Sequence, residues 1–217
     1  MKDYKYIFFD LDGTITDPGI GITNGVMYSL TYYGIPLPPR EELYKFIGPP
    51  LMESYQNYYG FSKEKSVEAL AVYREYYSEK GVHENELYPG IEELLIELKK
   101  AGKRIVLATS KPEYYAKIIL EHFQLSQYFT FIGGSDMAET VRPGKADVIM
   151  YDLESCGITD LSEVVMIGDR EHDVLGAKKA GIDSIGVLYG YGDRNELETA
   201  GADYIVEGID DLKKILI

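Results

Sequence analysis

The chain is predicted to be an α/β protein with a doubly wound, mostly parallel sheet and an inserted α-helical domain. Two observations predict this fold class. Short apolar runs alternate with amphipathic stretches from about residue 87 onward, which is typical of a parallel sheet with helices on both faces. Before that, after the first apolar run, about seventy residues show only helical spacing of apolar side chains.

Composition limits the possible partners and location. The net charge of −14 disfavours nucleic acid polymers and anionic membranes, because both attract basic surfaces. Cys156 is the only cysteine, so no intramolecular disulfide can form. The start of the chain lacks the apolar segment of a signal peptide, and no apolar run approaches the roughly 20 residues of a membrane span. We expect a cytoplasmic protein.

The first strand is predicted at Tyr6–Phe9, an almost wholly apolar run that suits a strand buried on both faces. Asp10 and Asp12 follow it directly, at the end of the strand where open α/β sheets bind their ligands. Two acids one residue apart point to opposite faces of a regular strand. They converge only if the chain leaves strand geometry near Leu11, and Gly13 permits such a turn.

The inserted domain is predicted at residues 16–86, and the catalytic core at residues 1–15 and 87–217. Apolar spacing, prolines and glycines predict four helices in the insertion, near 22–33, 41–47, 50–59 and 62–80. Half of the 20 tyrosines of the chain lie in the insertion. They fill a small core and its surface or, in the alternative interpretation, line a substrate pocket.

The core is predicted to continue as alternating strands and helices. Strands are expected at 104–108, 129–132, 163–167, 184–187 and 203–206, and helices at 91–100, 112–123, 145–153 and 173–180. No internal repeat or linker interrupts this order.

Polar residues follow four of the predicted strands and should meet above one edge of the sheet. They are Asp10 and Asp12, then Thr109, Ser110 and Lys111, then Arg142 and Lys145, and finally Asp169, Arg170 and Asp173. Carboxylate oxygens suit Mg²⁺, and a lysine with a hydroxyl suits a phosphate group. Each residue has a structural alternative: a helix cap, a solvated lysine or a strand-end hydroxyl. Together they indicate a metal-dependent phosphate site.

The sequence resembles the haloacid dehalogenase superfamily over essentially its whole length. Four segments carry this resemblance in the order of the family's motifs: residues 10–14, residues 107–111, Lys145 and residues 168–173. The chain is most similar to the phosphatase branch with a helical cap, which includes phosphoglycolate phosphatases. Within that branch it resembles the bacterial 5′-nucleotidase-like subgroup, on residues 46–51, 73–81, 87–90 and 186–192. The core would then be Rossmann-like.

The resemblance implies a role for each matching residue. Asp10 would be the nucleophile that forms an aspartyl-phosphate, and Asp12 the general acid and base. Mg²⁺ would be held by Asp10, the Asp12 carbonyl and Asp169, with Asp173 in the outer shell. Thr109, Ser110 and Lys145 would bind the phosphoryl group. Lys145 follows an unusual Arg142-Pro143-Gly144 in the third motif, so Lys111 remains an alternative to it.

The substrate is predicted only as a small phosphorylated metabolite, acted on by a Mg²⁺-dependent phosphatase. A nucleoside 5′-monophosphate is one substrate, and phosphoglycolate the alternative. A sugar phosphomutase or a phosphoacceptor module would also fit an acidic strand end, although a phosphoacceptor needs no helical cap. Lys45, Gly48 and Arg142 are the candidates for substrate specificity, since caps of this family place the loop around 45–50 over the nucleophile.

Overall fold

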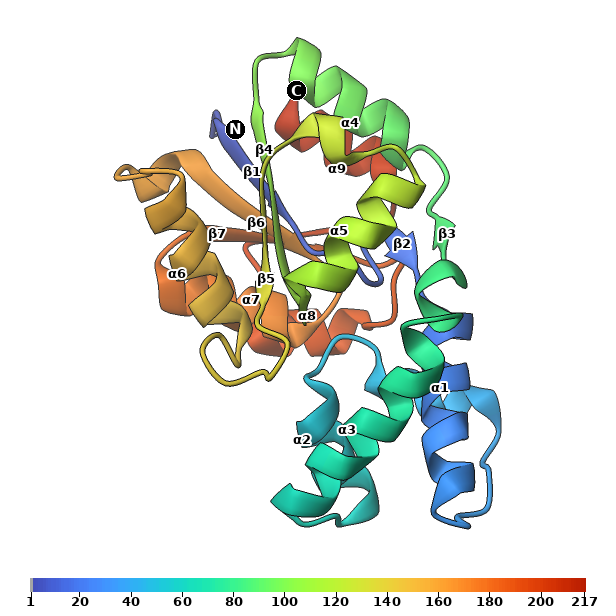
Figure 1. The fold of residues 1–217 in the computed structure, drawn as a ribbon. Coiled ribbons are helices and arrows are strands. Elements are labelled where there is room, and N and C mark those ends of the chain that lie inside the picture. Colours follow the sequence, from blue (N-terminus) through green and yellow to red (C-terminus); the bar gives the residue numbers. More distant parts are fainter. Residues whose placement is uncertain (1) are drawn as a thin grey trace. The chain divides into compact units, whose positions relative to one another are not determined.

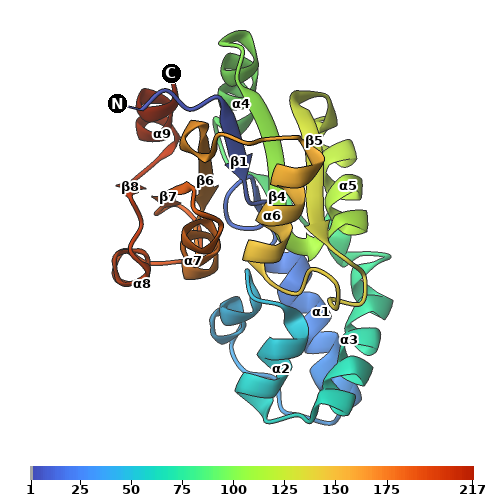
Figure 2. The same cartoon turned by 90° about the vertical axis from the view of Figure 1, so that its left-hand side faces the viewer.

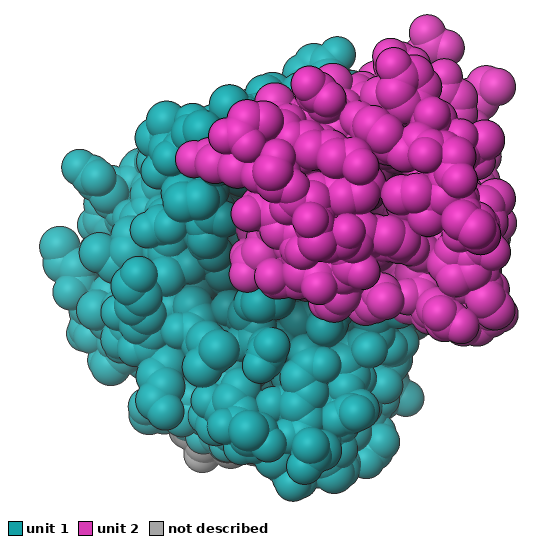
Figure 3. Space-filling model, turned by 90° about the horizontal axis from the view of Figure 1, so that it is seen from below, with its two compact units in different colours: residues 1–17, 87–217 teal, residues 18–86 magenta. Residues whose placement is uncertain are grey.

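The computed structural model describes residues 2–217, which divide into two compact units (Figures 1 and 3). Unit 1 runs to Asp17 and resumes at Leu87, and unit 2 spans Pro18–Glu86. The insertion thus begins two residues later than the sequence predicts. Thr16 and Asp17 belong to unit 1 because the Thr16 carbonyl accepts the amide of Gly13 at 2.8 Å and the Asp17 carboxylate accepts the hydroxyl of Tyr191.

Unit 1 is built on a six-stranded sheet in the order β5-β4-β1-β6-β7-β8, with every neighbouring pair parallel (Figure 2). Its strands are Tyr6–Phe9 (β1), Arg104–Pro112 (β4), Phe129–Ser135 (β5), Val164–Gly168 (β6), Asp183–Val187 (β7) and Tyr204–Val206 (β8). Chain order reverses at β1, between β4 and β6. The carboxyl end of β1 is therefore the topological switch point, where α/β sheets bind ligands.

Helices cover both faces of this sheet (Figures 1 and 2). They are Ile91–Lys100 (α4), Glu113–His122 (α5), Lys145–Ser155 (α6), Glu171–Ala180 (α7), Arg194–Ala200 (α8) and Ile209–Leu216 (α9), with 3₁₀ turns at Ser126–Tyr128 and Leu161–Glu163. Helices α6 and α7 bury Val148, Ile149 and Ala177 against the β1 side chains Tyr6 and Phe8. Right-handed crossovers put α4 and α5 on the opposite face. The predicted doubly wound parallel sheet is confirmed, but α8 and α9 were not predicted.

Unit 2 is helical. It contains Gly19–Tyr32 (α1), Leu51–Tyr59 (α2), Lys63–Tyr77 (α3) and 3₁₀ helices at Arg40–Phe46 and Gly81–His83. The segment predicted as a helix at 41–47 is therefore a 3₁₀ helix. The Ser62 hydroxyl caps α3 by accepting the amide of Lys65 at 3.2 Å. The tyrosines of unit 2 lie both in its core and on its surface: Tyr55 and Tyr77 are buried, whereas Tyr32 is 69% exposed.

Two short strands lie where the chain leaves unit 1 and where it returns to it. They are Thr16–Asp17 (β2) and Glu86–Leu87 (β3), which pair as a separate two-stranded sheet. Neither was predicted, because two residues carry no readable alternation of polar and apolar side chains. Within residues 2–217, no helix combines the length and apolar character that a membrane span requires.

Candidate active site

The chain turns sharply as soon as β1 ends. The amide of Asp10 still donates to the carbonyl of Ile167 on β6 at 2.9 Å, so the sheet fixes the backbone of Asp10. The carbonyl of Leu11 then accepts the amide of Ile15 at 2.8 Å, which closes a tight turn. Gly13 has φ of +83°, a conformation that glycine adopts most readily. The chain therefore leaves strand geometry where the sequence predicts, and both Asp10 and Asp12 are buried in one site.

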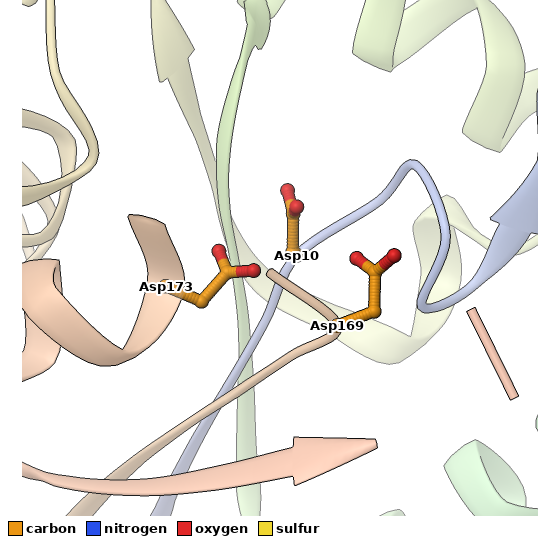
Figure 4. Close-up of side chains that lie close together, drawn as sticks. All are labelled: Asp10, Asp169 and Asp173. Carbon is orange, nitrogen blue, oxygen red and sulfur yellow. The ribbon is translucent and has the colours of Figure 1, made fainter. Parts of the chain in front are cut away.

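Three buried carboxylates from distant segments form a group that we call the acidic cluster: Asp10, Asp169 and Asp173 (Figure 4). One oxygen from each lies within 4.8 Å of the other two. Asp169 follows β6 directly, and Asp173 stands in the first turn of α7, where its Oδ2 accepts the amide of Arg170 at 3.1 Å. The sheet edge and one helix start thus hold three acids together.

Two buried lysines enter the same site. The Lys145 ammonium lies 2.7 Å from Oδ1 of Asp10 and 2.7 Å from Oδ1 of Asp173, and it donates to the carbonyl of Ala108 at 3.0 Å. The Lys111 ammonium lies 2.9 Å from Oδ2 of Asp12. Each candidate lysine therefore has a different acidic partner, and the structure brings both into the site.

Burial and mutual repulsion set the protonation of these acids. Burial, then Asp173 and Asp10, raise the pKa of Asp169 well above its usual range. Burial also raises the pKa of Asp12, against the opposing effect of Lys111. Burial alone would lower the pKa of Lys145, but Asp10 and Asp173 raise it, so the lysine stays charged. The site is short of positive charge.

The donor set fits a hard divalent cation. The acidic cluster offers only carboxylate oxygens, which Mg²⁺ prefers over nitrogen or sulfur ligands. With Asp12 there are four carboxylates against the two ammonium groups of Lys111 and Lys145, since Arg170 is paired with Glu196 at 2.8 Å. If all four acids are ionised, two negative charges remain, and one divalent cation would neutralise them.

Comparison with protein families decides the origin of this arrangement. The model of the haloacid dehalogenase-like hydrolase family matches residues 7–187, which include all three acids of the acidic cluster and both buried lysines. The chain belongs to the haloacid dehalogenase-like hydrolases. The predicted resemblance and the prediction of an enzyme are thereby confirmed.

Named proteins and a solved structure are similar to this chain over almost its whole length. A protein named 5′-nucleotidase from Pseudomonas aeruginosa is 40% identical over 213 residues, covering 98% of this chain and 96% of that protein. Tyrosine-protein kinase PtkA from Mycobacterium tuberculosis is 37% identical, covering 98% of this chain and 72% of that protein. The crystal structure of a predicted phosphatase from Clostridium acetobutylicum superposes with a TM-score of 0.96 at 48% identity, covering 98% of both chains.

The remaining predicted residues of this family site occupy distinct places. Thr109 is buried at the end of β4, where its hydroxyl accepts the amide of Lys111 at 3.2 Å, and Ser110 follows it half-buried. Arg142 donates to the carbonyl of Gly134 at 2.7 Å and lies 3.7 Å from Glu113. These contacts tie Arg142 to β5 and α5, and neither of them reaches the acidic cluster.

Lys45 and Gly48 lie in unit 2. The ammonium of Lys45 is 4.6 Å from the ring centroid of Tyr58, and Gly48 has φ of +103°. The tyrosine is 40% exposed, so the two side chains form a cationic and aromatic surface within this unit.

Sequence reasoning missed two residues that hold Asp169. The hydroxyl of Thr14 lies 3.4 Å from Oδ1 of Asp169, and the amide of Tyr191 donates to its Oδ2 at 2.7 Å. Thr14 lies inside the first motif and could have been found there. Tyr191 lies in the subgroup segment 186–192, but nothing in that segment shows that its amide donates to an acid 22 residues away.

Proposed function

We propose that the protein is a Mg²⁺-dependent phosphomonoesterase that acts on a small phosphorylated metabolite in the cytoplasm. One observation carries this proposal: a buried carboxylate at the switch point of the sheet, Asp10, lies within 4.8 Å of two further acids and 2.7 Å from a lysine. The proposed nucleophile, metal ligands and phosphate-binding lysine thus lie within a few ångströms of one another. The family membership and the phosphatase-named relatives support the same chemistry.

Asp10 and Asp12 would divide the chemistry between them. A carboxylate oxygen of Asp10 attacks phosphorus, and the bond to the leaving oxygen breaks while Asp12 protonates that oxygen. Asp12 then takes a proton from water, whose oxygen attacks the same phosphorus and releases phosphate with Asp10 regenerated. The raised pKa of Asp12 favours the protonated form that the first step requires. Its Oδ1 is buried and makes no hydrogen bond to any residue of the described chain.

The other site residues would bind and balance charge. Asp10, the carbonyl of Asp12 and Asp169 would hold Mg²⁺, with Asp173 in the outer shell. When bound, the ion supplies positive charge that offsets the charge of the phosphoryl group. Lys145, Thr109 and Ser110 would donate hydrogen bonds to the phosphoryl oxygens.

The proposed substrate is a nucleoside 5′-monophosphate, with phosphoglycolate as the alternative. Relatives named 5′-nucleotidase and phosphoglycolate phosphatase support these two classes, at 40% and 27% identity. Core residues would contact only the phosphoryl group and the metal, which all phosphomonoesters share. We therefore propose that residues 16–86 act as a cap that discriminates between substrates.

A panel assay tests the proposed function. Phosphate release is measured for nucleoside monophosphates, phosphoglycolate, sugar phosphates and an aryl phosphate, with Mg²⁺ or with excess chelator. We expect Mg²⁺-dependent hydrolysis with a preferred nucleoside monophosphate. A preference for phosphoglycolate selects the alternative, and dependence on a bisphosphorylated sugar selects a phosphomutase. Phosphorylation of Asp10 without turnover would indicate a phosphoacceptor module. An ATP arm with a tyrosine-containing protein tests the activity that the name of the mycobacterial relative describes.

Replacing Lys45 tests the cap as the source of specificity. A cation beside an exposed tyrosine suits a second acidic group and a base or sugar ring. We expect Lys45→Ala to lower kcat/KM for the best substrate about tenfold, and to change the activity toward a small aryl phosphate much less. Lys65→Ala is the matched control, because the Lys65 ammonium lies 3.9 Å from the ring centroid of Phe61 in the same unit. Equal losses with both substrates would exclude this loop as the selector.

A further inference from the structure

The segment Tyr189-Gly190-Tyr191-Gly192, which we call the YGYG strap, follows β7 and belongs to a subgroup motif that the proposed chemistry leaves unexplained. Its alternation of tyrosine and glycine matches no strand or helix pattern. Besides the ring of Tyr88, which packs on Tyr189 with ring centroids 5.0 Å apart, the strap contacts segments that build the active site.

The strap wraps closely around Asp169. The amide of Tyr191 donates to Oδ2 of Asp169 at 2.7 Å. A Cβ atom on Gly190 would stand 2.3 Å from the carbonyl oxygen of Gly13 and 2.4 Å from Cβ of Asp169, and one on Gly192 would stand 1.9 Å from the carbonyl oxygen of Asp169. Both positions therefore require glycine, because the backbone of the strap packs directly against that of the metal-binding turn.

The tyrosine hydroxyls of the strap reach the segment that leaves the nucleophile turn. The hydroxyl of Tyr189 donates to the carbonyl of Thr14 at 3.0 Å, and the hydroxyl of Tyr191 donates to the carboxylate of Asp17. Asp17 is the last residue of unit 1 before the chain enters unit 2. Through Tyr191 alone, one side chain and its own backbone amide join Asp17 to Asp169.

We propose that Tyr191 is a positioning residue for the divalent cation, which holds Asp169 in the metal-binding orientation through its amide and is itself held by the bond between its hydroxyl and Asp17. This inference rests on the proposed metal site. One oxygen of Asp169 is occupied by the amide, so the orientation of the carboxylate toward the cluster is fixed before an ion arrives. Outer hydrogen bonds of this kind tune metal affinity because they remove the freedom of a ligand to rotate.

The consequence is that affinity for Mg²⁺ depends on a hydroxyl that would not touch the ion. Tyr191→Phe keeps the backbone amide and the aromatic ring and removes the hydroxyl that donates to Asp17. The amide is then free to shift with the strap, and Asp169 loses its fixed orientation. We expect Mg²⁺ to bind about tenfold more weakly to this variant, within the range that loss of an outer-shell partner causes.

Mg²⁺ binding to the full chain, measured by titration calorimetry without substrate, tests this inference. Tyr4→Phe is the matched control, because the hydroxyl of Tyr4 also donates to a carboxylate, that of Asp183 at 2.6 Å, at the opposite end of β7. We expect weaker binding for Tyr191→Phe and wild-type binding for Tyr4→Phe. In activity assays, raising the Mg²⁺ concentration about tenfold should recover the activity that Tyr191→Phe loses at low Mg²⁺, whereas general damage to the fold would not respond to the ion.

A double-mutant cycle identifies the bond that carries the effect. Asp17→Ala should weaken Mg²⁺ binding as much as Tyr191→Phe, and the double variant no further, because both changes remove one interaction. Binding to Tyr191→Phe within twofold of wild type would overturn the inference, as would equal weakening in Tyr4→Phe or additive losses in the cycle. If the wild-type protein binds no Mg²⁺, the proposed function itself fails, and this outcome is distinct from the others.

Discussion

Unit 1 contains two kinds of buried carboxylate, and they differ in their surroundings. The acids of the acidic cluster lie beside the Lys145 ammonium, which is 2.7 Å from both Asp10 and Asp173. Asp152, on the same helix as that lysine, is fully buried, and neither of its oxygens has a hydrogen-bond partner among residues 2–217. It lies against the backbone of β5, where a Cβ on Gly133 would come within 1.7 Å of its Oδ1.

The comparison teaches that burial alone does not mark a functional acid. Burial raises the pKa of Asp152 to about 8, with Glu113 adding to this shift and Lys145 and Arg142 opposing it. Asp152 is therefore mostly protonated and uncharged at neutral pH, so it can act neither as a ligand for a hard cation nor as a nucleophile. In the acidic cluster, the Lys145 ammonium opposes the rise in the pKa of Asp173 that burial causes, and the proposed Mg²⁺ would favour the ionised form of all three acids. The two kinds of acid therefore differ in whether a positive charge lies directly beside them. Three substitutions and the addition of Mg²⁺ test this difference.

Asp10→Asn should have the largest effect, and it should act on activity alone. The amide is a poor nucleophile and a poor ligand for a hard cation. We expect turnover to fall at least about 10⁴-fold, with the unfolding midpoint nearly unchanged since Lys145 keeps Asp173 as a partner. Phosphate release and thermal unfolding measure the two quantities. Wild-type turnover, once deamidation is excluded by mass spectrometry, would remove Asp10 from the mechanism.

Asp12→Asn should show whether a buried acid near the cluster works as a proton donor. An alkoxide leaving group needs protonation, whereas an aryl oxide needs little. We expect single-turnover phosphorylation of Asp10 to slow about 100-fold more for an alkyl than for an aryl phosphate. The measurement must follow the first step, because Asp12 would assist hydrolysis of the intermediate for both substrates. Equal losses would leave Asp12 with a structural role.

Unlike the substitutions of Asp10 and Asp12, Asp152→Asn should increase stability and leave activity unchanged. Below about pH 3 the acid is protonated in both the folded and the unfolded state, since the unfolded pKa is about 3.9. As the pH rises toward the folded-state pKa of about 8, only the unfolded state releases its proton, and the wild-type protein loses stability. The variant does not titrate, so we expect its advantage in the free energy of unfolding to grow with pH and reach about 4 kcal/mol at pH 7.

Urea unfolding of both proteins at pH 4, 6 and 8 measures this difference. Asp160→Asn is the matched control, because hydrogen bonds from Ser162 lower the pKa of the exposed Asp160. The effect of this control should stay constant between pH 4 and 8. A constant difference for Asp152→Asn as well would show that Asp152 is ionised in the folded protein.

Mg²⁺ should produce the smallest change, a stabilisation of about 2.7 kcal/mol at a hundred times its dissociation constant. The ion would bind the acidic cluster and have no carboxylate to bind at Asp152. Its effect should therefore add to that of Asp152→Asn within about 0.5 kcal/mol and disappear in Asp10→Asn. Unfolding with Mg²⁺ or with chelator measures all three proteins. Full activity in excess chelator would contradict the metal site.

Much of the fold was predictable because its strands and helices produce recognisable local patterns of apolar residues. Apolar runs such as Tyr6–Phe9 and Val164–Gly168 are buried along their whole length, so the sequence shows them plainly. The helix at Arg194–Ala200 was missed because only Leu197 and Ala200 of its seven residues are buried, which is too few to show a period. The helix at Ile209–Leu216 did carry a signal, since its first turn is acidic and its last turn basic.

The sequence predicted which acids and lysines of unit 1 lie close together, but not the contacts that they make. Carboxylates at strand ends placed Asp10 and Asp169 correctly at one edge of the sheet. The choice between Lys111 and Lys145 could not be made, because pairing with Asp12 or with Asp10 depends on side-chain reach across the site. Asp152 could have been noticed, since it lies four residues after Val148 and thus on the buried face of its helix.

The strands β2 and β3 bring the two ends of the insertion together. The amide of Tyr88, just after β3, donates to the carbonyl of Ile15, just before β2, at 3.2 Å. The entropic cost of closing such an insertion grows slowly with its length, by only about 0.6 kcal/mol for each doubling. Unit 2 is therefore an exchangeable module: evolution, or an engineer, can replace residues 18–86 with another domain at this one junction and leave the sheet and its acids in place.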